Sequence, residues 1–328
     1  MAGVQGSALA AAVSNAGALG SLPCAMLGLD AMRSELAAMR AQCGDRYNVN
    51  FFCHVPAAVN AESEERWRAA LAPYYKELEI DPNTIPTGPG RTPFSSEAAD
   101  LLGEFKPAVV SFHFGLPSPA LVERVKALGS RVLASATTVE EALWLEAQGV
   151  DAIIAQGLEA GGHRGMFLSA DLSTQVGTFA LVPQIVREVK LPVIAAGGIA
   201  DAKGVASAIA LGAAGVQIGT AYLLCPEVTT SAVHRAALKS GAARHTALTN
   251  VFTGRPARGI VNRIMRELGP ISPKTPAFPL AASAVAPLRA KAEGKGSGDF
   301  SPLWSGQNAS GCKEISAAQL TRELAANL

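Results

Sequence analysis

The sequence has few aromatic residues and almost no charge imbalance, and each shortage excludes a class of protein. Aromatic residues make up 5% of the 328 residues, and the formal net charge is +1. A near-neutral chain has no electrostatic reason to bind nucleic acid or an acidic membrane surface. We therefore expect neither nucleic acid nor a membrane as a partner.

Cysteine is also scarce, and its spacing excludes two kinds of site. The five cysteines are odd in number, and no pair has C-x-x-C spacing. This pattern argues against a disulfide framework and against a structural zinc site. Cys53 precedes His54, but no second ligand pair lies nearby, so packing is the simpler interpretation. The sequence therefore predicts no metal site and a reducing, cytoplasmic location.

Long hydrophobic runs are missing from the N-terminal region. Asn15, Gly17 and Pro23 interrupt its apolar stretch, whereas a membrane span needs about 20 apolar residues in succession. A signal peptide needs a basic start, and no charged residue precedes Asp30. We interpret this region as a buried helix of a soluble protein.

A regular alternation of apolar runs and helical patterns is present. Short β-branched or apolar runs predict buried parallel strands at residues 18–21, 47–52, 108–112, 131–135, 152–156, 192–196 and 215–218. Helical patterns lie between them, the clearest at residues 119–128, 139–148 and 201–211. The alternation predicts an α/β fold, with a parallel sheet and helices outside it, of the TIM (β/α)8 barrel class.

Seven predicted strands are one fewer than a closed barrel needs. We expect the absent strand to be the first, because residues 1–4 read as a strand-to-helix loop that runs directly into a helix. The alternative is a genuine seven-stranded open sheet.

Two segments interrupt the rhythm of strands and helices. Residues 54–106 include a helical stretch at 61–78 and a proline- and glycine-rich loop at 82–93. So long a connection is typical of a functional loop or a small cap. Residues 223–304 continue with helical patterns, from 232–240 onward, and a proline- and alanine-rich region.

These interruptions suggest two domains. We predict a smaller helical lid or substrate domain at residues 223–304. The barrel would then comprise residues 1–222 plus 305–328, and it would end in an amphipathic helix at 316–326.

The strongest chemical signal is the glycine-rich sequence QGLEAGGHRG at residues 156–165. It follows a predicted strand directly, and active-site residues of barrels lie at the carboxyl ends of strands. Glycines there allow the backbone to approach a flat ligand closely. His163 is a candidate acid or base, because the pKa of histidine lies near working pH. The plainer alternative is a glycine-rich turn with a surface histidine.

Two more glycine-rich segments follow the last two predicted strands. They are AAGGIAD at residues 195–201 and GVQIGT at residues 215–220. In many barrels these loops bind a phosphate, because a row of backbone N–H groups faces it without intervening side chains. Thr220 can add a hydroxyl donor. Plain barrel packing is the alternative.

Three shorter motifs are weaker signals. His113, in FHFG, directly follows the predicted strand 108–112, where a core role and a site role are about equally supported. Asn50, in NVNF, can hydrogen-bond a cofactor but is also common in turns. Trp304, in WSGQ, can reach the site mouth or anchor the last helix. Cys225 follows the last strand, but nothing marks its thiol as activated.

Taken together and in order, these motifs resemble those of the nitronate monooxygenases, formerly called 2-nitropropane dioxygenases, over nearly the whole chain. The resemblance implies that FMN lies across the barrel mouth, with its phosphate at Gly198 and residues 217–220. It also implies that His163 is the catalytic base and that His113 lines the same pocket as a second catalytic residue. The implied cofactor-binding residues are Met1, Asn50, Gln156, Gly161, Gly162, Gly197, Gly198, Gln217, Ile218, Gly219 and Thr220.

The resemblance also implies a reaction. The enzyme would oxidise alkyl nitronates, such as propionate 3-nitronate, with O2 to a carbonyl compound and nitrite or other nitrogen oxides. A neutral nitroalkane would first lose an α-proton to a base. An anionic nitronate would be bound by a protonated histidine or by backbone N–H groups. The expected partners are this small molecule and O2, and the chain would act as a monomer or homodimer.

Three alternatives remain. An NAD(P)H-dependent FMN reductase acting on quinones or enoyl thioesters shares the barrel and similar glycine motifs, but residues 112–115 and 156–165 favour the monooxygenase. A flavin-free lyase or isomerase would need a Schiff-base lysine or paired carboxylates at strand ends, and we find none. The third alternative is a non-catalytic fragment that results from the absent strand.

Overall fold

The computed structural model describes residues 1–58, 60–85 and 91–328. Seven strands form one curled parallel sheet in the order β1-β2-β3-β4-β5-β7-β8. They are β1 (Gly20–Pro23), β2 (Tyr47–Phe52), β3 (Val109–His113), β4 (Arg131–Ala136), β5 (Ala152–Gln156), β7 (Val193–Ala196) and β8 (Gly215–Gln217). All seven predicted strands are present. The first begins two residues later than predicted, because its pairing with β2 starts at Gly20 opposite Tyr47.

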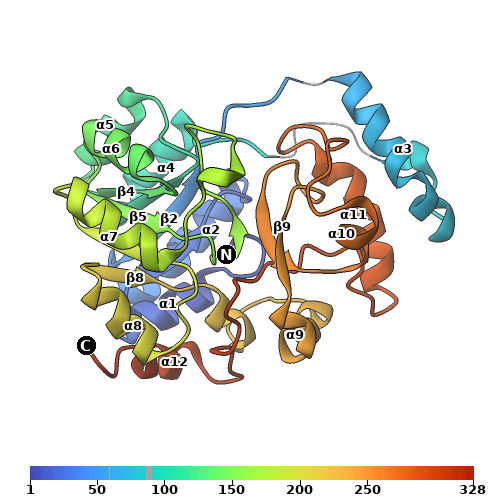
Figure 1. The fold of residues 1–328 in the computed structure, drawn as a ribbon. Coiled ribbons are helices and arrows are strands. Elements are labelled where there is room, and N and C mark those ends of the chain that lie inside the picture. Colours follow the sequence, from blue (N-terminus) through green and yellow to red (C-terminus); the bar gives the residue numbers. More distant parts are fainter. Residues whose placement is uncertain (59, 86–90) are drawn as a thin grey trace.

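Helices pack around the outside of this sheet (Figure 1). They are α1 (Ser7–Asn15), α2 (Leu29–Cys43), α4 (Ser96–Phe105), α5 (Pro119–Ala127), α6 (Val139–Ala147), α7 (Thr178–Glu188), α8 (Ala202–Ala210) and α12 (Ala317–Leu324). The strand residues Val49, Val110 and Ile153 share one fully buried core with Leu36, Leu102 and Leu145 of the helices. Strands buried on both faces read as continuous apolar runs, which explains why the sequence pattern located them.

Local capping explains where the predicted helices begin and end. The Asp201 side chain accepts a hydrogen bond from the Gly204 N–H at 2.8 Å, which caps α8. Gly212 follows α8 with a φ of +97°, a conformation that favours glycine. Thr138 caps α6 in the same way, through the N–H of Glu141.

The curled sheet has an opening between its first and last strands. Across the described ranges, β8 pairs with β7 and β1 pairs with β2, and β8 and β1 do not pair with each other. The strand order and helix placement are those of a (β/α)8 barrel with one strand position unfilled. The predicted barrel class, lacking one strand, is confirmed.

The rest of the chain builds a second part beside the barrel (Figure 1). Its antiparallel sheet has the order β6-β10-β9, with β6 (Gly162–His163), β9 (Thr246–Thr249) and β10 (Ala257–Ile260). Its helices are α3 (Ala61–Glu77), α9 (Ala232–Lys239), α10 (Arg263–Leu268) and α11 (Ala281–Glu293). The sequence predicted helices in residues 223–304 but not the strands β9 and β10. The division of the chain into domains stays a prediction.

Helix α3, which follows β2 in the sequence, belongs to this second part. The indole N–H of Trp67 donates to the Ala281 carbonyl at 3.2 Å, and the Tyr75 hydroxyl donates to the Ala284 carbonyl at 2.7 Å. These bonds tie α3 to α11 across more than 200 residues of sequence. The long connection after β2 therefore links the barrel to the second part. Part of its predicted loop, residues 86–90, lies outside the described residues.

The apolar N-terminal stretch forms α1, whose Leu9, Ala10 and Ala11 are buried. Within the described ranges, no helix is long and apolar enough to cross a membrane.

Candidate active site

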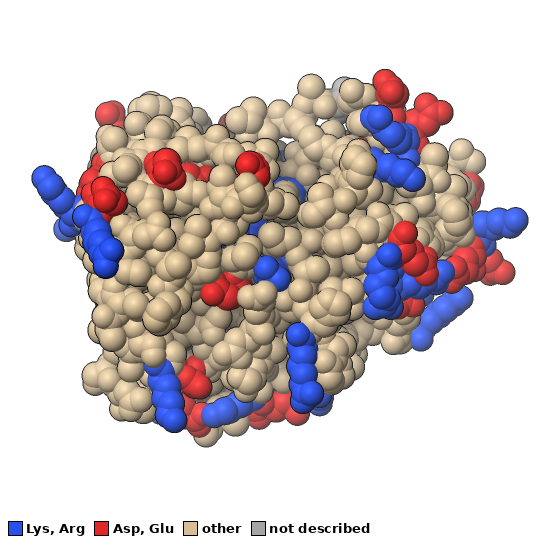
Figure 2. All heavy atoms as spheres, viewed as in Figure 1, with Lys and Arg blue, Asp and Glu red and all other residues tan. Residues whose placement is uncertain are grey.

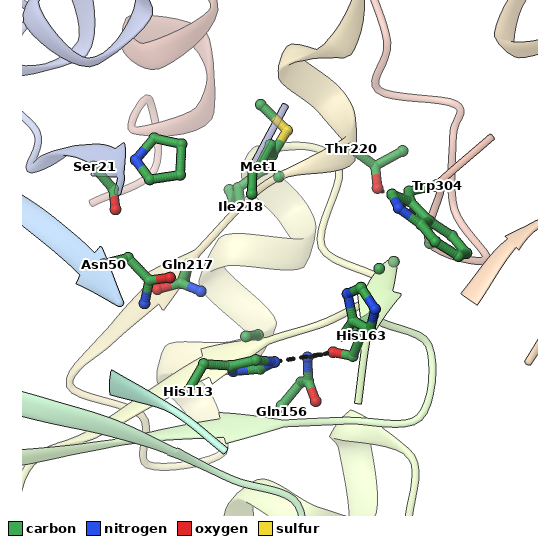
Figure 3. Close-up of a pocket in the computed structure, with 18 of the residues that line it drawn as sticks. Met1, Ser21, Asn50, His113, Gln156, His163, Gln217, Ile218, Thr220 and Trp304 are labelled. Carbon is green, nitrogen blue, oxygen red and sulfur yellow. Dashed lines mark hydrogen bonds between the residues drawn. The ribbon is translucent and has the colours of Figure 1, made fainter. Parts of the chain in front are cut away.

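A cavity of about 280 Å³ opens at the carboxyl ends of the barrel strands, where the second part covers them (Figure 3). Parallel strands end at the same edge of a sheet, so residues distant in sequence meet there. Every residue that the sequence predicted as catalytic or cofactor-binding lines this cavity: Met1, Asn50, His113, Gln156, Gly161, Gly162, His163, Gly197, Gly198, Gln217, Ile218, Gly219 and Thr220.

The barrel side of the cavity is mostly backbone. Gly197 and Gly198 have φ values of +120° and +74°, in the region that favours glycine. A Cβ atom on Gly161 would lie 2.5 Å from the Gly306 nitrogen. The hydroxyl of Thr220 accepts the Gly306 N–H at 2.9 Å, which leaves its own hydrogen to donate elsewhere. These close approaches leave a wall with few side chains.

Two features make this wall suitable for a flat, anionic cofactor. Gln217 is exposed although it belongs to a strand, because its side chain faces the cavity (Figure 3). Among the described residues that line the cavity, none is aspartate or glutamate. Backbone N–H groups without competing carboxylates are what a phosphate needs, so the residues present fit a flavin phosphate.

His163 lies on the opposite side, enclosed by aromatic rings. Its Nε2 is 2.9 Å from the hydroxyl of Thr253. Ring centroids at 5.4–6.1 Å surround it, from Phe278, Trp304, Phe114 and Phe52. Burial lowers the pKa of His163 well below its usual value, and the charge of Arg91 lowers it further. His163 is therefore neutral near pH 7 and able to accept a proton.

His113, at the end of β3, is held by two hydrogen bonds. Its Nε2 donates to the His163 carbonyl at 3.1 Å, and its Nδ1 is 3.0 Å from the Ser135 hydroxyl (Figure 3). Since a carbonyl only accepts, Nε2 carries the proton, and in the neutral ring Nδ1 accepts from Ser135. Burial lowers the pKa of His113 to about 3. Both ring nitrogens of His113 are thus committed to the protein.

The glycine-rich loop is fastened at both ends by buried side chains. The Gln156 amide donates to the His163 carbonyl at 3.0 Å and accepts the Gly165 N–H at 2.7 Å. Arg164, fully buried, donates to the carbonyls of Gln156 and Gly157 at 2.8 and 2.7 Å. This network fixes the loop that carries His163.

The structure also shows where the residues of the weaker sequence motifs lie. The Asn50 amide donates to the Ser111 hydroxyl at 2.9 Å, which orients it at the cavity edge. Trp304 lines the cavity beside His163, so the WSGQ motif reaches the site mouth. Cys225 is buried, and burial raises the pKa of its thiol to about 12, which keeps it protonated.

Sequence reasoning missed several residues of the site. Ser135 is the penultimate residue of β4, so its position near the strand end was a signal that could have found it. Arg91, Thr253 and Phe278 come from the long connection or the second part, where no strand pattern marks them.

Comparison with known proteins identifies the family. The model of the family described as "Nitronate monooxygenase" matches residues 1–327. The chain belongs to the nitronate monooxygenase family. Because this is a family of flavin-dependent oxidoreductases, the protein is an enzyme, and the predicted family and enzyme class are confirmed.

Individual relatives support the same assignment. The chain is 44% identical to the nitronate monooxygenase of Paraburkholderia phytofirmans, covering 99% of this chain and 89% of that protein. It is 42% identical to the one of Pseudomonas aeruginosa, covering 100% and 94%.

Solved structures resemble the whole fold. Nitroalkane oxidase from Streptomyces ansochromogenes matches with a TM-score of 0.90 and 36% identity, over 100% of this chain and 93% of that one. FabK from Thermotoga maritima matches with a TM-score of 0.71 and 27% identity, over 99% and 89%.

Proposed function

We propose that this enzyme oxidises alkyl nitronates, such as propionate 3-nitronate, with FMN and O2 to a carbonyl compound and nitrite or other nitrogen oxides. Membership of the family supports the reaction class. The observation that carries the proposal is a neutral histidine, His163, in the same cavity as a glycine-rich backbone wall free of carboxylates. One wall suits a flat anionic cofactor, and the other offers a base.

In this proposal the barrel wall holds FMN, which supplies the electron chemistry when bound. Its phosphate would be bound by backbone N–H groups at Gly198 and residues 217–220, with the Thr220 hydroxyl as a further donor. Asn50, Gln156 and Gly161 would contact the rest of the cofactor. The close approach of Gly161 to Gly306 supports this role, because it keeps side chains out of the wall.

His163 would act as the base toward neutral nitroalkanes. The Thr253 hydroxyl lies 3.4 Å from the Arg255 carbonyl, to which it can donate, so its oxygen accepts from Nε2 of His163. Nδ1 then carries the lone pair that takes the α-proton. A nitronate has already lost that proton, so the base matters less for it.

His113 would position the loop rather than react. Its bond to the His163 carbonyl, shared with Gln156, holds the backbone at the base. A permanent proton on Nε2 and a lowered pKa favour this passive role.

An anaerobic mixing experiment tests the function. Purified yellow protein is mixed with propionate 3-nitronate, and the visible absorbance of the flavin is followed. We expect the nitronate to change the flavin spectrum. If the flavin absorbance does not change with the nitronate but falls rapidly with NADH, the reductase would be supported instead. Colourless protein that takes up no FMN would contradict the flavin assignment.

A further inference from the structure

Arg91 brings a charged side chain to the cavity. Of the described lining residues, Arg91 alone carries a charged side chain. It lies in the connection between η1 (Pro82–Thr84) and α4. Figure 2 shows that most charged side chains on this face project from the periphery, with some basic and acidic atoms in the middle.

Among the residues that the structure describes, no carboxylate pairs with Arg91. It is half-buried, and burial lowers its pKa with no opposing contribution from an acid. Among the described residues it makes no ion pair. The neighbouring residues 86–90 have the sequence PTGPG, which contains no acid. A desolvated cation without a partner is costly, so the site gains from an anionic ligand.

The position of Arg91 places this charge near the base. Its guanidinium carbon lies 5.5 Å from the centroid of the Phe278 ring. The His163 ring lies 5.4 Å from the same centroid. Arg91 and His163 both line the cavity, so a small ligand bound there can approach both side chains.

The neighbouring Arg255, unlike Arg91, directs its guanidinium toward groups of the protein. It donates to the Met166 carbonyl and lies 4.0 Å over the ring of Phe114. Arg255 is not among the residues that line the cavity. With His163 and His113 both neutral, Arg91 is the side chain that offers positive charge to a ligand.

We propose that Arg91 binds a planar oxyanion of the substrate and thereby makes the site select anionic nitronates over neutral nitroalkanes. The inference rests on the proposed function. Nitronate and carboxylate groups both present two coplanar oxygens, which match the two parallel N–H groups of a guanidinium. Arg91 is thus a specificity-determining residue that lies outside the strand-end motifs.

The test compares three substrates in two variants and a control. Arg91→Gln removes the charge, Arg91→Lys keeps it without the fork, and Arg66→Gln removes an exposed charge on α3. We expect Arg91→Gln to lower kcat/KM about 10- to 100-fold for ethyl nitronate and propionate 3-nitronate, the range of a charged hydrogen bond. Nitroethane should change less than about 3-fold, and Arg91→Lys should fall between.

A binding measurement accompanies the kinetics. Nitrate is a planar anion that is not oxidised, and its binding is followed by the change in flavin absorbance. We expect Arg91→Gln to weaken nitrate binding at least about 10-fold, while flavin content and thermal unfolding match the wild type.

The outcomes separate the possible anions and the possible failures. If Arg91→Gln lowers kcat/KM for ethyl nitronate, Arg91 binds the nitronate oxygens. If it lowers kcat/KM only for propionate 3-nitronate, Arg91 binds the carboxylate of that substrate. The inference is overturned if kcat/KM falls equally for nitroethane and the nitronates. It is also overturned if neither kcat/KM nor nitrate binding changes. A wild type that oxidises no nitronate refutes the proposed function, and nitrate binding then still decides whether Arg91 is an anion site.

Discussion

The two walls of the cavity are built from different material. The barrel wall consists of glycine-rich backbone at the ends of β5, β7 and β8, with few side chains. The opposite wall includes the side chains of Arg91, from the long connection, and Trp304, from the second part. Thr253 and Phe278 of the second part contact His163. His163 belongs to this opposite wall, because its strand β6 follows the barrel loop yet pairs with β10.

This difference suggests that the barrel wall binds the cofactor and the opposite wall binds the substrate. Backbone N–H groups at strand ends suit a cofactor that must be held the same way in every turnover. The aromatic side chains of the second part and the charged Arg91 lie on segments outside the barrel. Such residues suit a variable substrate, since each can be substituted during evolution without altering the barrel. Four experiments test this comparison, from the largest expected effect to the smallest.

Loss of the base should have the largest effect. His163→Gln should lower kcat/KM for nitroethane about 100- to 10,000-fold, because proton abstraction loses its base. The value for ethyl nitronate should fall much less, since no proton is removed. The exposed His245→Gln is the matched control, and equal losses for the two substrates would refute the role of His163 as a base.

A methyl group in the barrel wall should damage cofactor binding. A Cβ atom on Gly161 would lie 2.5 Å from the Gly306 nitrogen and 2.6 Å from the Ser305 carbonyl carbon, both backbone. Gly161→Ala should therefore weaken FMN binding about 100-fold, as measured by fluorescence titration. Gly215→Ala, where the added atom meets nothing within 4 Å, should bind FMN normally. Normal FMN binding by Gly161→Ala would mean that the wall is not the cofactor site.

The enclosed histidines should make stability sensitive to acid. Burial lowers the pKa of His234 to about 4 and that of His113 to about 3, whereas an unfolded histidine titrates near 6.5. Below 6.5 the unfolded chain binds more protons, so stability falls as pH falls. The loss should be about 1 kcal/mol per pH unit for each such histidine, between about pH 6.5 and the folded pKa.

Urea unfolding from pH 7 to 5 measures this slope. His234→Gln should reduce the change in unfolding free energy per pH unit by about the contribution of one buried histidine. The exposed His245→Gln serves as the control and should leave this slope unchanged. Identical slopes in all three proteins would show that burial of His234 does not govern the acid response.

The smallest effect should come from the partner of the base. Thr253→Val removes the hydroxyl 2.9 Å from His163 Nε2. Without that bond the ring is less well oriented, so kcat for nitroethane should fall about 10-fold and its pH profile should shift, with KM nearly unchanged. Thr253→Ser keeps the hydroxyl and should recover most of the rate, and a serine variant as slow as the valine one would indicate a packing role instead.

Local patterns were enough to predict the barrel side of this protein. All seven strands were found because buried parallel strands are apolar along most of their length. The glycine-rich segments were found because strand ends converge at one edge, whatever the distance between them in the sequence. Even the cap of α8 at Asp201 follows from residues a few positions apart.

Tertiary structure alone decided the opposite wall. The strands β9 and β10 have four residues each and pair with each other, and β10 also pairs with β6. Such pairing between distant segments leaves no periodic pattern in the local sequence. Arg91 lines the cavity and Thr253 lies 2.9 Å from His163 Nε2, although both are distant from the barrel strands in the sequence. Periodicity predicts which face of an element is buried, whereas contacts between distant segments depend on packing that only the folded chain determines.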